Sequence, residues 1–245
     1  MRAHRNSFGG FAGGGSTQRF NGLPIIYDVC WDFGIKTFGS AWRLEYLVAM
    51  TQGTLSDPRN SGGDNNDGKQ ITFRIGLVPL TGLIIGASYA QGPYLDQSVA
   101  AALQGQEVED FDQKVVGLDL EFGIRHLKII GEVVFNRWEA PNITDEGGNR
   151  TDLTNVGGYV EAKYALRPGL YGAVRYDHLA FGKIHDGAGG TVPWDEPIQR
   201  WEWGIGYYLH DGVIAKVLRQ DIRVEHLNAP DSVNHFWATQ LSVSF

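Results

Sequence analysis

Bulky and small side chains alternate over the last nine residues of the chain, WATQLSVSF. Trp237, Thr239, Leu241, Val243 and Phe245 would share one face of a strand, with small or polar residues on the other. Successive side chains of a β-strand point to opposite faces, whereas a helix repeats about every 3.6 residues. The pattern therefore predicts a strand with one apolar and one polar face.

The same alternation recurs along the chain in about eleven segments. Most are close to the ~9–11 residues that a tilted strand needs to cross a bilayer. The least regular segment is the tenth, because Leu218 and Arg219 fall on faces that do not suit them. The predicted strands cover residues 25–36, 40–52, 69–79, 82–91, 113–125, 127–138, 155–166, 170–181, 199–210, 212–224 and 235–245.

Composition agrees with β structure, because the chain has 33 glycines and 12% aromatic residues. Mean hydropathy is −0.22, and the absence of any run of about 18 apolar residues excludes a transmembrane helix. A transmembrane barrel stays possible, because its strands are apolar only at alternate positions. The net charge of −7 and the scattered basic residues argue against a nucleic-acid-binding protein.

The connections between predicted strands alternate strictly in length. Short links at 37–39, 80–82, 125–127, 167–169 and 210–212 alternate with long polar segments at 53–68, 92–112, 139–154, 182–198 and 225–234. Outer-membrane barrels have short periplasmic turns and long outer loops, whereas a soluble sandwich has no reason to segregate loops in this way. The sequence therefore predicts an all-β fold, an antiparallel transmembrane β-barrel with 11–12 strands in this chain.

An odd number of strands predicts that part of the barrel is missing. If 225–234 is an outer loop, Phe245 lies at the periplasmic end, and residues 1–24 form an outer loop or N-terminal extension. Bacterial barrels have an even number of strands with both ends periplasmic. The glycine-rich GGFAGGGSTQRF is a weak candidate for a twelfth strand. We therefore expect residues 25–245 to be the C-terminal part of a larger, even-stranded barrel.

Several strings resemble bacterial outer-membrane porins of the broad group that contains the phosphate-selective porins. They are LPIIYDVCWDFG, LVAMTQGTLSDP, NDGKQITFRIG, GASYAQGPYL, VVFNRWEAP and GGYVEAKYALRPGLYGAVRYD. The terminal LSVSF resembles the signal that the barrel-assembly machinery reads, which makes Phe245 the expected assembly signal. The resemblance implies a water-filled channel in the bacterial outer membrane, in contact with outer-membrane lipid and lipopolysaccharide, and often a homotrimer.

Charged residues indicate which face of the strands is wet, because Arg or Lys costs roughly 2–4 kcal/mol on the lipid side at the membrane midplane. Most strand charges fall on the small or polar face. The candidate lumen-lining residues are Arg43, Glu45, Arg74, Asp119, Glu121, Glu132, Glu161, Lys163, Arg175, Arg200 and Glu202. These charges could create a field across the pore or form ion pairs that hold the strands together. Their balance of signs, together with the acidic long segments, predicts a weakly cation-preferring or unselective channel.

No motif predicts an enzyme, a metal site or a bound cofactor. The loop DPRNSGGDNNDGK does not fit the calcium-binding EF-hand pattern, and the sequence contains neither HExxH nor GxSxG. The main prediction is a porin-like channel for passive diffusion of small hydrophilic solutes or ions. Two alternatives stay open: a structural or adhesive barrel whose loops 92–112 and 182–198 bind a partner, and a soluble β-protein that binds a sugar or an apolar ligand.

Overall fold

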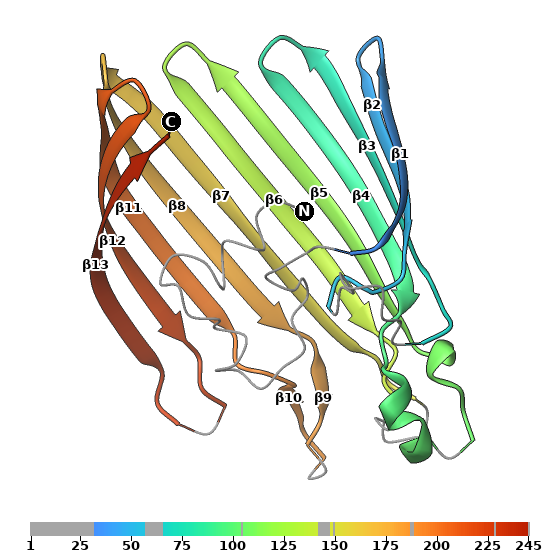
Figure 1. Cartoon of the computed structure of the whole chain (residues 1–245). Coiled ribbons are helices and arrows are strands. Elements are labelled where there is room, and N and C mark those ends of the chain that lie inside the picture. Colours follow the sequence, from blue (N-terminus) through green and yellow to red (C-terminus); the bar gives the residue numbers. More distant parts are fainter. Residues whose placement is uncertain are drawn as a thin grey trace.

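In the computed structural model, the chain is described over residues 32–56, 66–103, 105–141, 148, 150–186, 189–227 and 229–244. Eleven strands of these residues form one antiparallel sheet. They are β1 (Gly34–Ala41), β2 (Leu44–Thr51), β3 (Gln70–Leu80), β4 (Leu83–Pro93), β5 (Asp112–Ile124), β6 (Leu127–Trp138), β7 (Leu153–Arg167), β8 (Leu170–Phe181), β11 (Ile198–His210), β12 (Val213–Val224) and β13 (Ser232–Val243). Figure 1 shows the sheet as a curved, open wall.

The two edges of this wall do not meet. Within the described part of the chain, β1 pairs with β2 alone and β13 pairs with β12 alone. An unclosed sheet is what the odd number of predicted strands led us to expect. Residues 1–31, which include the candidate twelfth strand and most of the first predicted strand, lie outside the described residues.

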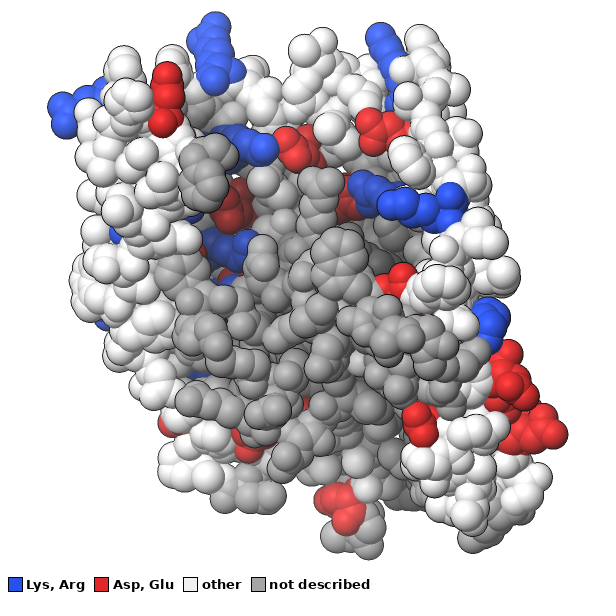
Figure 2. Space-filling model, in the orientation of Figure 1, with Lys and Arg blue, Asp and Glu red and all other residues white. Residues whose placement is uncertain are grey.

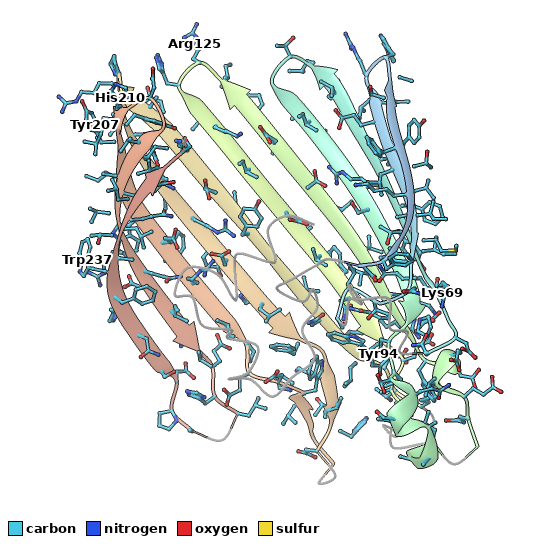
Figure 3. The ribbon with its side chains drawn as sticks, in the orientation of Figure 1. Lys69, Tyr94, Arg125, Tyr207, His210 and Trp237 are labelled. Carbon is cyan, nitrogen blue, oxygen red and sulfur yellow. The ribbon has the colours of Figure 1, made fainter. Side chains whose placement is uncertain are left out.

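Short turns gather at one end of the sheet and long connections at the other. Figure 3 places Arg125 and His210 at the end with the short turns, and Lys69 and Tyr94 at the opposite end. A small hairpin of β9 (Lys183–His185) and β10 (Thr191–Pro193) extends the long connection between β8 and β11. This segregation is the one that the sequence predicted. In outer-membrane barrels, the end with the short turns is generally the periplasmic one.

The first predicted turn was misplaced. Residues 37–39 lie inside β1, and the chain reverses at Trp42 and Arg43 instead. Trp42 takes φ of 56°, a conformation that usually favours glycine. The sequence has tryptophan at this position, and therefore did not indicate a turn there. Gly39 has a different role, because a Cβ there would lie 2.7 Å from the Tyr46 hydroxyl oxygen. The Tyr46 ring packs across the strand where Gly39 has no side chain.

The alternation sorts side chains onto two faces, which the strand register identifies. We call the outer face the one that carries Leu44, Leu120 and Val160, and the inner face the one that carries Arg74, Asp119 and Asp177. Large apolar side chains are exposed across the outer face. They include Leu44, Val48, Phe73, Ile85, Leu118, Leu120, Phe135, Val160, Val174 and Ile205. Soluble proteins bury most such side chains, whereas a surface that contacts lipid exposes them. The predicted fold class, an antiparallel transmembrane β-sheet of the barrel type, is therefore confirmed.

On β12, charged residues interrupt the apolar outer face. On β12 the outer face carries Arg219 and Asp221, opposite Trp237 and His235 of β13. Asp221 accepts hydrogen bonds from Arg219 Nε at 3.1 Å and from the His235 ring at 2.5 Å. The Arg219 guanidinium lies 5.5 Å from the centre of the Trp203 ring, on the neighbouring β11. These charges satisfy one another, which lowers the free-energy cost of placing them on this face. Figure 3 shows Trp237 at the side of the sheet, pointing away from it.

The main apolar core lies on the inner face, close to the long connections. Two 3-10 helices, η2 (Gln97–Ala102) and η3 (Val108–Asp110), lie in the connection between β4 and β5. Leu103, Val108 and Phe111 of this segment form a buried cluster with inner-face residues of β4, β5 and β6. The sequence predicted 92–112 only as a long polar loop, because its apolar residues do not alternate. Burial of this segment narrows the space inside the curved sheet at the outer end.

Candidate pore wall

The inner face gathers most of the predicted site residues. Ten of the eleven candidate lumen-lining residues lie on it: Glu45, Arg74, Asp119, Glu121, Glu132, Glu161, Lys163, Arg175, Arg200 and Glu202. They share it because inner positions recur at every second residue and the register aligns them from strand to strand. Figure 2 shows acidic and basic side chains next to one another on this side of the molecule.

The remaining candidate, Arg43, was placed wrongly. It belongs to the turn between β1 and β2 and is exposed there, with its guanidinium donating to the backbone oxygen of Pro79 at 2.7 Å. The misplaced first turn put it inside a strand. Phe245, the predicted assembly signal, lies outside the described residues.

A dense group of charges holds the inner face where β7, β8 and β11 meet. Asp177 of β8 is 0% exposed and accepts hydrogen bonds from Arg175 Nη2 at 2.8 Å and Arg200 Nε at 2.9 Å. Arg175 also lies 3.5 Å from a Glu161 carboxylate oxygen, and 3.8 Å from the centre of the Tyr159 ring. We call these five residues the Asp177 network. Each arginine offers several donors in a fixed plane, so two of them can satisfy one buried carboxylate.

Charges on β3 to β6 form separate pairs instead. Arg74 makes a two-point contact with Asp119, in which Nη2 and Oδ2 lie 2.8 Å apart, and it also donates to Ser88 Oγ at 3.1 Å. A Cβ on Gly86 would lie 2.5 Å from the Arg74 guanidinium, so this pair lies directly over the glycine. Lys128 and Glu121 form a second pair at 2.7 Å, and both side chains are 47% exposed.

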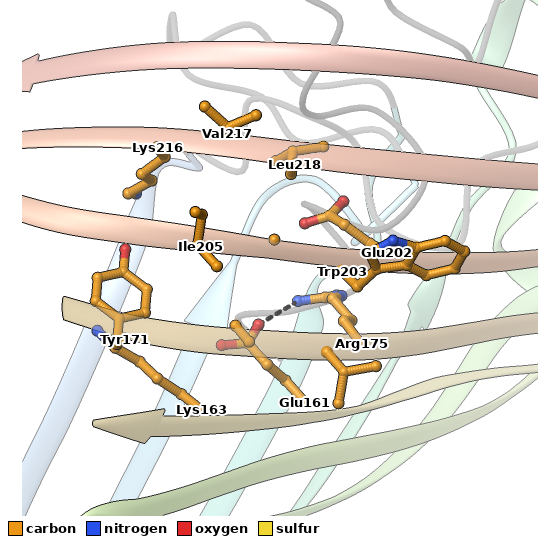
Figure 4. A pocket seen from close by; sticks show the side chains of 13 residues that line it. Glu161, Lys163, Tyr171, Arg175, Glu202, Trp203, Ile205, Lys216, Val217 and Leu218 are labelled. Carbon is orange, nitrogen blue, oxygen red and sulfur yellow. Dashed lines mark hydrogen bonds and ion pairs between the residues drawn. The ribbon is translucent and has the colours of Figure 1, made fainter. Parts of the chain in front are cut away.

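A hollow of about 240 Å³ opens on the inner side of β7, β8, β11 and β12, between the Asp177 network and the short turns. Figure 4 shows charged side chains around it, with Glu161 and Arg175 joined by an ion pair. Its polar rim consists of Glu161, Lys163, Tyr171, Arg175, Glu202 and Lys216. The sequence predicted four of these six as site residues. Tyr171 was missed, since an aromatic residue near a strand end also suits a membrane interface.

At the outer rim, Glu139, just beyond β6, links the end of β6 to the start of β5. Its carboxylate accepts from Lys114 Nζ at 2.6 Å and from the backbone N–H of Asp112 at 3.2 Å. Burial alone would raise the pKa of Glu139, but these hydrogen bonds and the charges of Lys114 and Arg150 hold it below its usual value. The Tyr94 hydroxyl donates to the backbone oxygen of Glu139 at 3.2 Å, and burial raises the pKa of Tyr94 to about 12.

Metal-binding geometry is absent from the described residues, where no three His, Cys, Asp or Glu side chains come close enough to hold an ion. The described part of the chain also has no helix that is long and apolar enough to cross a membrane.

Comparison with known proteins identifies the fold. No protein-family model matches the sequence, and no curated protein is significantly similar to it. The outer membrane channel DcaP of Acinetobacter baumannii is similar, with TM-score 0.63 and 12% identity over 86% of this chain and 62% of that chain. OmpT of Vibrio cholerae has TM-score 0.60 and 12% identity, over 98% of this chain and 73% of that chain.

A third similar structure is OmpF of Salmonella typhi in complex with daunomycin, with TM-score 0.53 and 14% identity over 84% of this chain. The chain spans 62% of the DcaP structure and 60% of the OmpF structure. The likeness shows that the sheet has the fold of outer-membrane porin barrels.

Proposed function

We propose that this chain forms part of the wall of a porin-like channel in the bacterial outer membrane, through which small hydrophilic solutes or ions diffuse passively. The observation that carries the proposal is the separation of the two faces. Apolar side chains cover most of the outer face, while ion pairs such as Arg74–Asp119 and Arg175–Asp177 lie on the inner face. A charged surface enclosed by an apolar one suits a water-filled passage through lipid. Passage needs no chemical step, so we propose no catalytic role.

The charges of the described inner face support low ion selectivity. Acidic and basic side chains are equally numerous in its strands. The acids are Glu45, Asp119, Glu121, Glu132, Glu161, Asp177 and Glu202, and the bases are Lys36, Arg74, Lys128, Lys163, Arg175, Arg200 and Lys216. The outer rim is acidic around η3, where Glu107, Glu109 and Asp110 lie. A negative rim raises the local cation concentration, so we propose a pore with weak or no cation preference.

Conductance in a planar bilayer with a salt gradient tests this function. We expect stepwise conductance and a reversal potential that is small, of the sign for cation preference, and smaller still at high salt. The Debye length falls from about 10 Å at 0.1 M to about 3 Å at 1 M, which screens the rim. Absence of any conductance from correctly inserted protein would contradict the channel. A strong preference for phosphate or chloride would contradict the proposed selectivity.

The partners implied by the resemblance stay predictions. They are outer-membrane lipid and lipopolysaccharide around the apolar face, the barrel-assembly machinery acting on Phe245, and other copies of the chain in a homotrimer. Membership of the phosphate-selective group also stays a prediction, and the balanced charges of the inner face do not favour it.

A further inference from the structure

We propose that the hollow on β7, β8, β11 and β12 binds small zwitterions, such as amino acids or dipeptides, on their way through the pore. Lys163 and Lys216 would bind the carboxylate, and Glu202 would bind the ammonium group. The inference deepens the proposed function and rests on it, because the pore is what brings a solute to the hollow. It names a solute class and a binding position that ion diffusion alone does not require.

The hollow exists because two facing inner positions have small or no side chains, Gly204 of β11 and Ala173 of β8. The next inner position of β11, Gly206, is covered instead. The Tyr171 ring lies over Gly206, where an added Cβ would come within 2.3 Å of its hydroxyl oxygen. The volume of about 240 Å³ is below the roughly 300–1,000 Å³ that is typical of sites for drug-sized ligands. The space therefore suits a small solute.

One end of the hollow is basic and has no acidic partner. Lys163 Nζ lies 3.6 Å from the centre of the Tyr171 ring and 3.5 Å from the Tyr208 hydroxyl oxygen. Lys216 lies opposite Gly206 in the register. Neither lysine forms an ion pair with any described carboxylate, in contrast to Lys114 and Lys128. Two ammonium groups that border the same hollow, one of them over an aromatic ring, suit a carboxylate.

The other end is acidic and also has spare capacity. Glu202 borders the hollow, and its carboxylate has no hydrogen bond or ion pair to another described residue. Arg175, the nearest candidate donor in the register, contacts Asp177 at 2.8 Å and Glu161 at 3.5 Å instead. Glu202 can therefore accept hydrogen bonds from an ammonium group of a solute.

The distance between the two ends selects a zwitterion over a simple ion. Glu202 is four residues from Gly206 on the same strand, which places their Cα atoms about 13 Å apart at roughly 3.3 Å per residue. Lys216 lies beside Gly206, and both long side chains can reach into the space between. A solute with opposite charges several ångströms apart can contact both ends. An anion alone would leave Glu202 unpaired, and a cation alone would leave the two lysines unpaired. Bound solutes would align with the carboxylate toward the periplasmic end.

Binding to the purified full chain in detergent tests this inference without requiring conductance. The probes are glycylglycine, acetate and methylammonium, measured by isothermal titration calorimetry. We expect glycylglycine to bind at least about tenfold more tightly than either single ion, because a hydrogen bond to a charged group contributes about that factor. The comparison uses unmodified protein and therefore does not depend on whether a variant folds. If acetate binds as tightly as glycylglycine, or if glycylglycine does not bind, the inference is wrong.

Two variants then assign the ends of the site. Lys216→Met should weaken both glycylglycine and acetate about tenfold, whereas Glu202→Gln should weaken glycylglycine by that factor and leave acetate unchanged. Matched controls are Lys36→Met and Glu45→Gln, which remove the same charges from the inner face of β1 and β2. Equal effects of the controls would show that the overall charge matters and not this hollow. Conductance without zwitterion binding would contradict the proposed site but not the channel. Zwitterion binding without conductance would contradict the channel but not the site.

Discussion

Two sectors of the inner face use the same kinds of charged residue in different ways. On β3 to β6, Arg74 and Asp119 form a separate pair whose side chains are 32% and 23% exposed. On β7, β8 and β11, Asp177 is fully buried between two arginines whose side chains are 13% and 8% exposed. Alternation places both sets on the inner face, so the difference comes from what surrounds them. The first set is wet enough to respond to ions in the pore, and the second holds three strands together.

Of the changes considered, removing one carboxylate from each sector should give the largest difference in the free energy of unfolding. Asp177→Asn removes the buried carboxylate that Arg175 and Arg200 share, and breaking a buried ion pair in this way costs about 3–5 kcal/mol. Asp119→Asn breaks a partly exposed pair, for which about 1 kcal/mol is expected. Urea-induced unfolding of both variants, refolded into lipid vesicles, measures the two free-energy changes. Equal losses would show that the two sectors do not differ as described.

An ion pair on the opposite face extends the comparison to lipid. Asp221→Leu leaves Arg219 and His235 of the outer face without their shared carboxylate. We expect it to lower the free energy of unfolding by about 1–3 kcal/mol, between the costs of a charge near the interface and near the midplane. The double change Arg219→Leu and Asp221→Leu removes both charges and should recover most of that loss. The same unfolding assay gives the coupling free energy from the two single variants and the double variant. A double variant less stable than Asp221→Leu would indicate that this face does not contact lipid.

The sequence could predict the features of the inner face that depend on local interactions, but not those that depend on contacts between distant segments. Alternation is local, so it located the inner-face positions of Arg74, Asp119 and Glu202 and the strands that carry them. The turn at Trp42 was missed because the residue takes a conformation that its type rarely adopts. Which sector would bury its charges could not be predicted, because Asp177 depends on the register of β8 against β11, which pairs Asp177 with Arg200. That register spans the β9–β10 hairpin and is not encoded in the periodicity of either strand.

The smallest effect on stability is expected from the carboxylate of Glu139 at the outer rim, which belongs to neither sector. Glu139 accepts hydrogen bonds from Lys114 and from the backbone N–H of Asp112 at the start of β5, and its pKa is lowered in the folded protein. A carboxyl group with a lowered pKa stabilises the fold fully above its unfolded pKa, about 4.3, and loses this contribution as the pH falls through the folded value.

We therefore expect the backbone amide of Asp112, at the start of β5, to lose hydrogen-exchange protection on acidification below about pH 4, with a change of at most about 1 kcal/mol for this partly solvated group. In Glu139→Gln, hydrogen-exchange protection should already be low at neutral pH and should change little further on acidification. Asp152→Asn is the matched control, because Asp152 pairs with Arg137 at the same rim and forms no hydrogen bond with the described residues of β5. An acid-induced loss that persists in Glu139→Gln would assign the pH dependence to another carboxylate.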